Sequence, residues 1–415
     1  MGQRGTTSLP PMTRKPLVLL HTTTGATRSY SHALATLAGV LHRDGYGADE
    51  LLLITLDTET VRATSDQILS LSPHSVLVTA MSNQWHRVSQ LAELIKQEAP
   101  QIRLYVGGTH VTAAPDTFLC SRFDSAVVGE GEMVLMNLLT ASSPPRIVKG
   151  DAVADLDHLP MPYLPLFDPA DMLEYPSVMF SRGCPYHCSY CMSRNGGIGG
   201  RVRWKSPSRA IQEVAALIDY AGPKEIFIDD DTLLKNPTWV ARFCDEYKAN
   251  FAIPFLCNAR PETVKAPILD RLVRAGCSAI GIGIESGSSR LRAQVLDREM
   301  SDDVIIKAFF TAKSVGLRTW SFNMVGLPGE TADDLKATVE INERARVDFV
   351  RVSIFTPYPG TPAVDASDLH DKPYIRSPRD LPDDLRNVYV SWIFRLREAG
   401  RLWVTDTEEK ICNNQ

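Results

Sequence analysis

The sequence predicts an α/β protein with two domains, each built on a parallel β-sheet. Three observations predict this fold class. Short apolar runs alternate with amphipathic segments over residues 16–140 and again over 177–365, as in strands joined by crossover helices. A proline-rich stretch separates the two series. The length of 415 residues also suits two domains, since one domain takes roughly 100–200 residues.

The composition excludes several classes of protein. Hydrophobic residues make up 44% and charged residues 22% of the chain, as in globular proteins. No apolar run approaches the roughly 18 residues that span a bilayer, and the net charge of −5 does not favour a polyanionic partner. Residues 1–15 are polar and lack the apolar segment of a signal peptide, so we expect a disordered tail. We therefore predict a cytoplasmic protein with no membrane and no nucleic-acid partner.

The first series, 16–140, predicts a doubly wound domain. Its strands are expected at 16–21, 51–56, 75–80, 102–106 and 125–128, and its helices at 32–42, 64–70 and 87–97. In such folds ligands bind beyond the carboxyl ends of the strands, where the strand order switches. The small and polar residues near these ends include Ser82, Gly107, Gly108 and Gly129. A dinucleotide is not indicated, because no G-x-G-x-x-G follows the first strand.

Residues 141–176 predict a linker, because proline at their density opposes a regular helix. The second series, 177–365, predicts six further strand–helix units. Its strands are expected at 177–181, 225–229, 253–258, 279–284, 318–325 and 349–355, and its helices at 208–220, 238–249, 266–275, 302–315 and 331–345. Right-handed crossovers bring all the carboxyl ends to one face, where barrel enzymes carry their chemistry. Residues 366–415 predict an extension with one amphipathic helix at 381–400.

Three cysteines, Cys184, Cys188 and Cys191, lie within eight residues just after the first strand of the second series. Iron–sulfur clusters normally take four thiolates, so three on one loop would leave one iron open to a ligand that is not protein. The alternatives are a structural zinc loop, with His187 as a further ligand, or three unrelated core cysteines. Zinc sites usually pair C-x2-C with a second pair at a distance, which this loop lacks.

Charged residues follow other strands of the second series. Asp230 and Asp231 belong to a run of three aspartates after the second strand, which must be solvated or face a cation because adjacent carboxylates repel. Glu285 follows the fourth strand among small residues, placed to accept hydrogen bonds from a ribose or an ammonium group, or to form a structural ion pair. Arg260 follows the third strand, where it could bind a carboxylate or brace these acids.

The spacing C-x3-C-x2-C resembles the signature of the radical S-adenosylmethionine (SAM) superfamily. G-I-E-S-G at 283–287, the segment 323–331 and Y-P-G-T-P at 358–362 resemble further elements of it. The resemblance implies a partial (β/α)6 barrel over 177–365 and a 4Fe-4S cluster on the three cysteines. It further implies that Tyr190, Asp230 or Asp231, Arg260, Glu285, Val325 and Gly326 bind SAM, and that an electron donor such as flavodoxin or ferredoxin is a partner. The alternative role of Tyr190 is to pack the loop, and the alternative role of the aspartates is to cap the start of a helix.

Y-V-G-G-T-H at 105–110 and V-V-G-E-G-E at 127–132 resemble the Rossmann-like, cobalamin-binding domain that precedes the barrel in one branch of this superfamily. The resemblance covers 16–140 and implies cobalamin near Ser82, Gly107, Gly108 and Gly129. The D-x-H-x-x-G motif of many cobalamin proteins is absent. Cobalamin therefore binds without a protein imidazole, or the domain has kept its fold and lost the cofactor.

The combined resemblance implies a cobalamin-dependent methyltransferase. It would methylate an unactivated carbon, or a phosphinate phosphorus, of a small natural-product intermediate, as in antibiotic biosynthesis. One alternative is a radical SAM dehydratase, epimerase or rearrangement enzyme, acting for example on an aminosugar, with a vestigial cobalamin domain. Another is a non-catalytic Fe–S or zinc scaffold.

Overall fold

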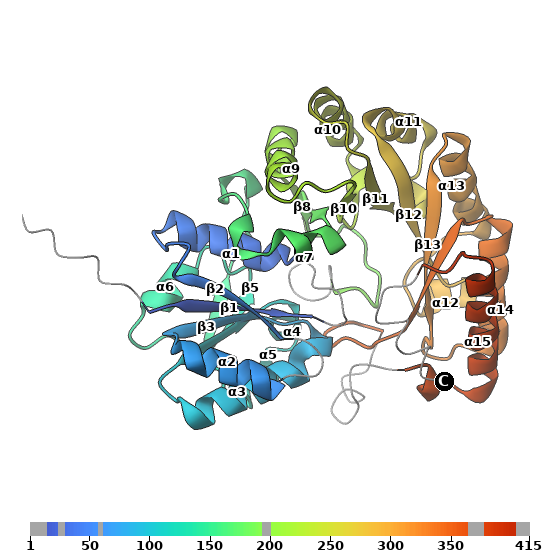
Figure 1. The fold of residues 1–415 in the computed structure, drawn as a ribbon. Helices are drawn as coiled ribbons and strands as arrows, with labels where there is room; N and C mark the ends of the chain where they lie inside the picture. Colours follow the sequence, from blue (N-terminus) through green and yellow to red (C-terminus); the bar gives the residue numbers. More distant parts are fainter. Residues whose placement is uncertain (1–14, 24–29, 57–60, 193–200, 364–376, 404–415) are drawn as a thin grey trace, which may run out of the picture.

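The computed structural model describes residues 15–23, 30–56, 61–192, 201–363 and 377–403, arranged as two α/β domains side by side (Figure 1). Of the tail predicted at 1–15, residues 1–14 lie outside the described residues. The extension predicted at 366–415 is described only over 377–403.

The first domain contains a sheet of six parallel strands in the order β2-β1-β3-β4-β5-β6. The strands are β1 (Leu17–Thr22), β2 (Leu51–Leu56), β3 (Ser75–Thr79), β4 (Arg103–Gly107), β5 (Ser125–Gly129) and β6 (Ile147–Gly150). The helices are α1 (His32–Arg43), α2 (Val61–Leu71), α3 (Trp85–Glu98), α4 (Thr109–Ala113), α5 (Pro115–Leu119) and α6 (Leu135–Thr140). The predicted doubly wound fold is confirmed, and the strand order switches between β1 and β3.

Both faces of this sheet are covered. In β1, Leu17 and Leu19 join the large core that runs into the second domain, whereas Val18 and Leu20 join a separate core on the other face. Successive side chains of a strand point to opposite faces, so each face receives alternate residues. A strand buried on both faces is nearly all apolar, and for that reason β1 was easy to predict from the sequence.

The linker predicted at 141–176 is not a plain connection. Its first part forms β6, which pairs in parallel with β5 from Ala126↔Ile147 to Gly129↔Gly150. Its last part forms a short helix, α7 (Pro169–Glu174), with Asp168 as its cap. Proline is tolerated at the first turn of a helix because that N–H has no helical partner. The edge strand escaped prediction since its exposed and half-buried residues show no apolar run.

The second domain contains six parallel strands in strict chain order, β7-β10-β11-β12-β13-β14. They are β7 (Ser177–Val178), β10 (Ile226–Ile228), β11 (Phe255–Ala259), β12 (Cys277–Glu285), β13 (Arg318–Val325) and β14 (Phe349–Ile354). The helices are α9 (Pro207–Ala221), α10 (Pro237–Asn250), α11 (Ala266–Ala275), α12 (Ser289–Gln294), α13 (Asp302–Ser314) and α14 (Ala332–Arg344). The sheet keeps β7 and β14 as its two edges, which agrees with the predicted partial barrel.

Smaller elements complete the chain. The hairpin β8 (Ser181–Arg182) and β9 (Arg203–Trp204) is antiparallel. Short 3-10 turns are η1 (Ser82–Gln84), η2 (Leu156–His158), η3 (Leu164–Leu166), η4 (Leu233–Lys235), η5 (Pro261–Thr263) and η7 (Pro378–Asp380). No helix within the described ranges is long and apolar enough to cross a membrane.

The second sheet has an outer face and an inner face. Outer residues such as Ile228, Cys257 and Ile282 pack in the large core with the helices. Phe227 and Trp320 belong to a small separate cluster on the other face. We call this second face the inner face. Figure 1 shows the helices of this domain along the outer side of the strands.

The C-terminal helix α15 (Asp383–Glu398) confirms the helix predicted at 381–400. After it, Leu402 forms a bridge with Val350 of β14. The ring of Trp403 stacks on Trp320, with the ring centres 5.3 Å apart. Since Trp320 lies early in β13, this contact covers the amino-terminal end of the inner face.

Gly281→Ala should destabilise the protein. A Cβ atom at this position would overlap the buried indole ring of Trp320. Overpacking of a core costs about 1–3 kcal/mol, so we expect a lower melting temperature by calorimetry. Gly107→Ala is the matched control, because the nearest atoms to its Cβ lie at an ordinary 3.9 Å. Equal melting temperatures for the two variants would contradict the packing at Gly281.

Candidate functional site

The three cysteines lie together on the loop that follows β8. Cys184 and Cys188 are buried and Cys191 is partly buried. Burial, together with the nearby Asp231, Cys191 and Cys188, raises the pKa of the Cys184 thiol to about 11, although a backbone hydrogen bond at Tyr186 lowers it. A bound metal reverses such a shift, because its charge deprotonates a coordinating thiol.

The three thiols of this loop are a donor set that iron–sulfur clusters use. Within the described parts of the chain, no three His, Cys, Asp or Glu side chains form a group that could hold one metal ion. A 4Fe-4S cluster presents its irons at separate corners, so each thiolate binds its own iron and the thiolates need not converge on one point. The three cysteines therefore suit the cluster that the sequence implies.

Asp230 holds the start of the cysteine loop. Its carboxylate accepts hydrogen bonds from the backbone N–H of Phe180 at 3.0 Å and of Ser181 at 2.6 Å, and from the Ser181 hydroxyl. Burial raises its pKa to about 6, against these hydrogen bonds. The side chain is fully buried. These contacts give Asp230 a structural role in the loop, and its contact with SAM remains a prediction.

The other two aspartates differ in their surroundings. Asp231 is exposed and lies close enough to Cys184 to affect its titration, so Asp231 remains the predicted ligand contact. Asp229 is half-buried, and burial with the charges of Asp231 and Asp230 raises its pKa to about 7. Asp229 could not be singled out from the sequence, because three adjacent aspartates give no signal of which one faces inward.

Glu285 pairs with an arginine that the sequence analysis missed. Arg298 donates to the Glu285 carboxylate at 3.2 Å, to the Tyr190 hydroxyl at 3.2 Å and to the Gly283 carbonyl at 2.6 Å. Burial raises the pKa of Glu285, while Arg298, Tyr190 and Arg260 oppose the shift. The structural ion pair considered for Glu285 is present, and it leaves SAM binding by Glu285 and Tyr190 as a prediction.

The backbone at Glu285 supports a special role for this residue. Its φ of +68° lies in the left-handed region, which a residue other than glycine rarely adopts. The strand pairing between β12 and β13 also shifts between Gly283 and Glu285. Such local strain is found at ligand sites, where the surrounding structure enforces it.

Arg260 lies beside the cysteine loop. Its guanidinium donates to Cys188 Sγ at 2.9 Å and to the Glu262 carboxylate at 2.6 and 2.8 Å. It also lies 3.8 Å above the centre of the Tyr186 ring. The structure thus pairs Arg260 with Glu262 rather than with Glu285 or the aspartates. Arg260 therefore lies against one of the three loop cysteines, and its binding of SAM remains a prediction.

The loop after β13 is built from main-chain contacts. Val325 is fully buried, and Gly326 has a φ of +84°. The N–H groups of Gly326 and Leu327 donate to the Glu330 carboxylate at 2.5 and 3.1 Å. The path of the adenine along Val325 and Gly326 remains a prediction.

In the first domain, Ser82 is committed to a neighbour. Its hydroxyl lies 3.0 Å from His110 Nδ1, and both residues are buried. At Gly108 a Cβ would meet Ala80 and Thr79 at 2.8 Å, and at Gly129 it would overlap Gly150. These two glycines, both at positive φ, are thus required by chain packing. The cobalamin contacts predicted at Ser82, Gly107, Gly108 and Gly129 remain predictions.

Two other polar atoms at the switch point suit a ligand better. Thr23 Oγ1, after β1, and Asn83 Oδ1, after β3, are buried without a hydrogen-bond partner. Buried polar groups are almost always paired, so orphaned ones often mark a missing ligand or water. Their place at the switch between β1 and β3 is where doubly wound sheets bind ligands. Strand-end position pointed to this region, but not to these two residues.

An ion network joins the two domains at the cluster site. We define it as Glu130 and Glu132, after β5, with Arg182 of β8 and Arg203 of β9. Arg203 donates to Glu130 at 2.5 and 2.9 Å, and Arg182 bonds Glu132 at 2.6 Å and pairs with Glu130 at 3.2 Å. Burial would raise the pKa of Glu130, but Arg203, the N–H of Val153 and Arg182 together lower it.

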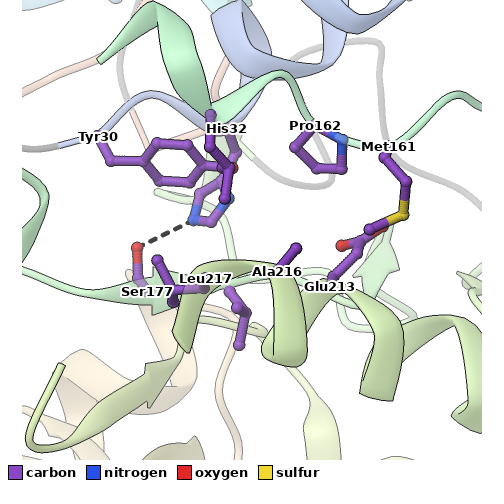
Figure 2. Close-up of a pocket in the computed structure, with 10 residues that line it drawn as sticks. Tyr30, His32, Met161, Pro162, Ser177, Glu213, Ala216 and Leu217 are labelled. Atoms are coloured by element: carbon purple, nitrogen blue, oxygen red, sulfur yellow. Dashed lines mark hydrogen bonds between the residues drawn. The ribbon is translucent and has the colours of Figure 1, made fainter. Parts of the chain in front are cut away.

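A small pocket lies between α1, α9 and residues 161–164 of the segment that was predicted as a linker (Figure 2). His32 in this pocket lies 3.0 Å from the Ser177 hydroxyl, and burial lowers its pKa to about 3. The pocket encloses about 10 Å³, which is room for about one water molecule. It cannot hold a cofactor, so His32 serves to connect α1 with the start of the second sheet.

Comparison with known proteins identifies two domains. The Radical SAM superfamily model matches residues 178–341, and the B12 binding domain model matches residues 22–139. An uncharacterized methyltransferase of Pyrococcus horikoshii is 28% identical, over 71% of this chain and 69% of that protein. The hopanoid C-2 methylase of Rhodopseudomonas palustris is 23% identical, over 88% and 69%.

Solved structures share the fold. The radical SAM methyltransferase TsrM from Kitasatospora setae, described with cobalamin and a 4Fe-4S cluster, superposes with a TM-score of 0.67 at 15% identity, covering 90% of this chain and 84% of that one. Another structure of that enzyme, with tryptophan as substrate and a SAM analogue, gives a TM-score of 0.66 at 17% identity, covering 84% and 75%.

Arg203→Ala should strongly destabilise the protein at pH 7, because it leaves Glu130 buried without its main partner. The expected loss in the free energy of unfolding is about 3 kcal/mol, measured by urea unfolding. Arg122→Ala is the control, since its ion pair with Glu93 is exposed and such pairs contribute about 0–1 kcal/mol.

The effect of Arg203→Ala should also depend on pH. The folded-state pKa of Glu130 lies below its ordinary value, so Glu130 contributes stability above that ordinary value and loses it as the pH falls through the folded-state pKa. The difference between Arg203→Ala and the unmodified protein should therefore shrink in acid. A difference that stays constant down to strongly acidic pH would contradict the proposed pairing.

Proposed function

Because the chain belongs to the radical SAM enzymes that carry an N-terminal B12-binding domain, we propose that it is a cobalamin-dependent radical SAM methyltransferase. The proposal assigns the cluster to Cys184, Cys188 and Cys191, and SAM to the side of the loop that faces Asp231 and Glu285. It assigns cobalamin to the switch point of the first sheet. When bound, these groups would supply radical formation from SAM and a transferable methyl group.

One observation carries the proposal. The ion network ties the end of β5, at the ligand edge of the first sheet, to the hairpin that bears the cysteine loop. A methyl group carried at the first domain would therefore lie next to a radical formed at the second. The protein would orient both cofactors and the substrate toward one another and exclude water between them.

We further propose that the methyl acceptor is an unactivated carbon of a small molecule. The hopanoid C-2 methylase is a relative that modifies carbon according to its name, and radical formation is the route that such a carbon requires. A phosphinate phosphorus in a natural-product intermediate is the other acceptor to be tested. The reducing electron would come from a donor such as flavodoxin or ferredoxin.

Reconstitution with hydroxocobalamin tests the cobalamin assignment. Protein loaded anaerobically with iron, sulfide and hydroxocobalamin should retain cobalamin through gel filtration, seen in its visible spectrum. A double variant, Thr23→Val with Asn83→Leu, removes the two orphaned polar atoms and should lower this retention several-fold. Failure of the unmodified protein to retain any cobalamin would remove the methyltransferase assignment while leaving the radical SAM assignment in place.

Replacing Cys184, Cys188 or Cys191 by Ala should abolish formation of 5′-deoxyadenosine from SAM and lower the iron content. Each cysteine supplies one of only three protein ligands to the cluster. Cys244→Ala is the matched control, because Cys244 is also buried but lies in α10 within the core. Retained SAM cleavage in any of the three loop variants, measured by liquid chromatography, would refute the cluster assignment.

A further inference from the structure

The inner face of the second sheet carries three polar side chains that other protein groups leave unsatisfied. Asn258 Oδ1 on β11 and Arg351 Nε on β14 are buried and have no hydrogen-bond partner. No hydrogen bond or ion pair to the Asp229 carboxylate or to the Arg351 guanidinium exists in the part of the chain that the structure describes. Buried polar groups without partners are costly, so a ligand is a natural explanation for the two buried atoms, and the half-buried Asp229 carboxylate is a third group without a partner in this part of the chain.

Strand register brings two of these residues, Asp229 and Asn258, to one level of the sheet. Asn258 pairs with Gly281 of β12, and Gly281 pairs with Trp320 of β13. Asp229 lies two residues after Phe227, an inner-face residue that is paired with the residue two before Asn258. Since side chains alternate between faces, Asp229 and Asn258 lie side by side on the inner face.

Arg351 faces them from the other edge of the sheet. It pairs with Phe322, one inner-face position beyond Trp320, and its guanidinium carbon lies 5.9 Å from the centre of the Phe322 ring. Between Asn258 and Arg351 the strand β12 presents Gly281, which is covered by the indole ring of Trp320, and Gly283, which is covered by the side chains of Glu285 and Arg298. The charges of Asp229 and Arg351 are thus held on two sides of a face whose centre is aromatic near Gly281 and ionic near Gly283.

Asp229 and Arg351 attract each other without touching. The Arg351 charge lowers the pKa of Asp229, yet burial and the neighbouring aspartates still raise it to about 7. No contact within ion-pair distance joins the two residues. Tyr175 packs on Phe227 of the inner face, with the ring centres 5.1 Å apart. Burial raises the pKa of Tyr175, the charge of Asp229 adds to this rise and the charge of Arg351 opposes it. A ligand that carries a cation and an anion would neutralise both side chains at once.

The side chains on either side of Asn258 indicate the chemical character of the rest of the ligand. Toward the amino-terminal ends of the strands the inner face is apolar, with Phe227, Leu256 and Trp320 in one cluster. Toward the carboxyl ends lie Glu285 and the cysteine loop. A molecule bound at the level of Asn258 would therefore contact apolar side chains toward the amino-terminal ends of the strands. Its opposite side would face the cysteine loop at the carboxyl ends.

We propose that this inner face binds the methyl acceptor and that the acceptor is a small zwitterion, with its ammonium group at Asp229 and Asn258 and its carboxylate or phosphate at Arg351. This inference rests on the proposed function, which it deepens by naming the substrate class. Arg351 offers a bidentate fork to the anion, and Asp229 with Asn258 offers only acceptors to the cation once Asp229 is ionised.

Binding of matched probes tests the proposal on the reconstituted full-length protein. The probes are L-tryptophan with tryptamine and indole-3-propionate, and L-leucine with isopentylamine and 4-methylpentanoate. Each set separates the zwitterion from its amine and its acid. At least one zwitterion should bind about tenfold more tightly than both of its singly charged analogues, as the loss of one charged hydrogen bond predicts. No such preference in either set would overturn the proposal.

Two conservative variants assign the charges. Arg351→Gln should weaken the binding of the zwitterion and of the acid by about tenfold but leave the binding of the amine unchanged. Asp229→Asn should weaken the binding of the zwitterion and of the amine by about tenfold but leave the binding of the acid unchanged. Arg318→Gln is the control, because Arg318 is exposed at the start of the neighbouring strand. Unchanged probe affinity in both inner-face variants would overturn the proposal, and circular dichroism would show whether each variant is folded.

SAM affinity, measured in the same preparations, separates substrate from cofactor. Loss of SAM affinity rather than probe affinity in Asp229→Asn would assign Asp229 to the ammonium group of SAM and overturn the inference. Failure of the proposed function itself would look different. It would appear in the unmodified protein as absent cobalamin or absent 5′-deoxyadenosine, whatever the probes do.

Discussion

The ion network of Glu130, Glu132, Arg182 and Arg203 is the interaction on which the arrangement of the site depends. It connects the ligand edge of the first sheet to the two short strands that flank the cysteine loop. Glu130 and Glu132 are less than 10% exposed, so their charges are stable only while the arginines stay in place. Separating the domains would leave these charges exposed or unpaired, so the network holds the carboxyl end of β5 against the hairpin that precedes and follows the cysteine loop.

The second domain shows how the same sheet serves stability and chemistry. Its outer face is apolar and packed under helices, whereas its inner face changes from aromatic to polar to charged along the strands. Unpaired polar groups and a carboxylate with a raised pKa lower stability, and proteins retain such groups mainly where function requires them. The large outer core provides the stability that offsets this cost.

Much of the fold was predictable, and the failures have physical causes. Strands buried on both faces, such as β1 and β12, and amphipathic helices, such as α11, carry strong periodic signals. The edge strand β6 carries none, because one of its sides faces solvent. Short helices that begin with proline, such as α7, look like proline-rich linkers in sequence.

The site was predictable in part for a similar reason. By itself the sequence determined the cysteine loop, the order of the strands' functional ends and the presence of a carboxylate at Glu285, since these depend on spacing along the chain. Only the tertiary structure decided that Asp230 braces the loop, that Arg298 pairs with Glu285 and that Asp229 faces Arg351. Such pairings depend on which way each side chain points and on what a distant strand brings opposite, and neither is written in local sequence spacing.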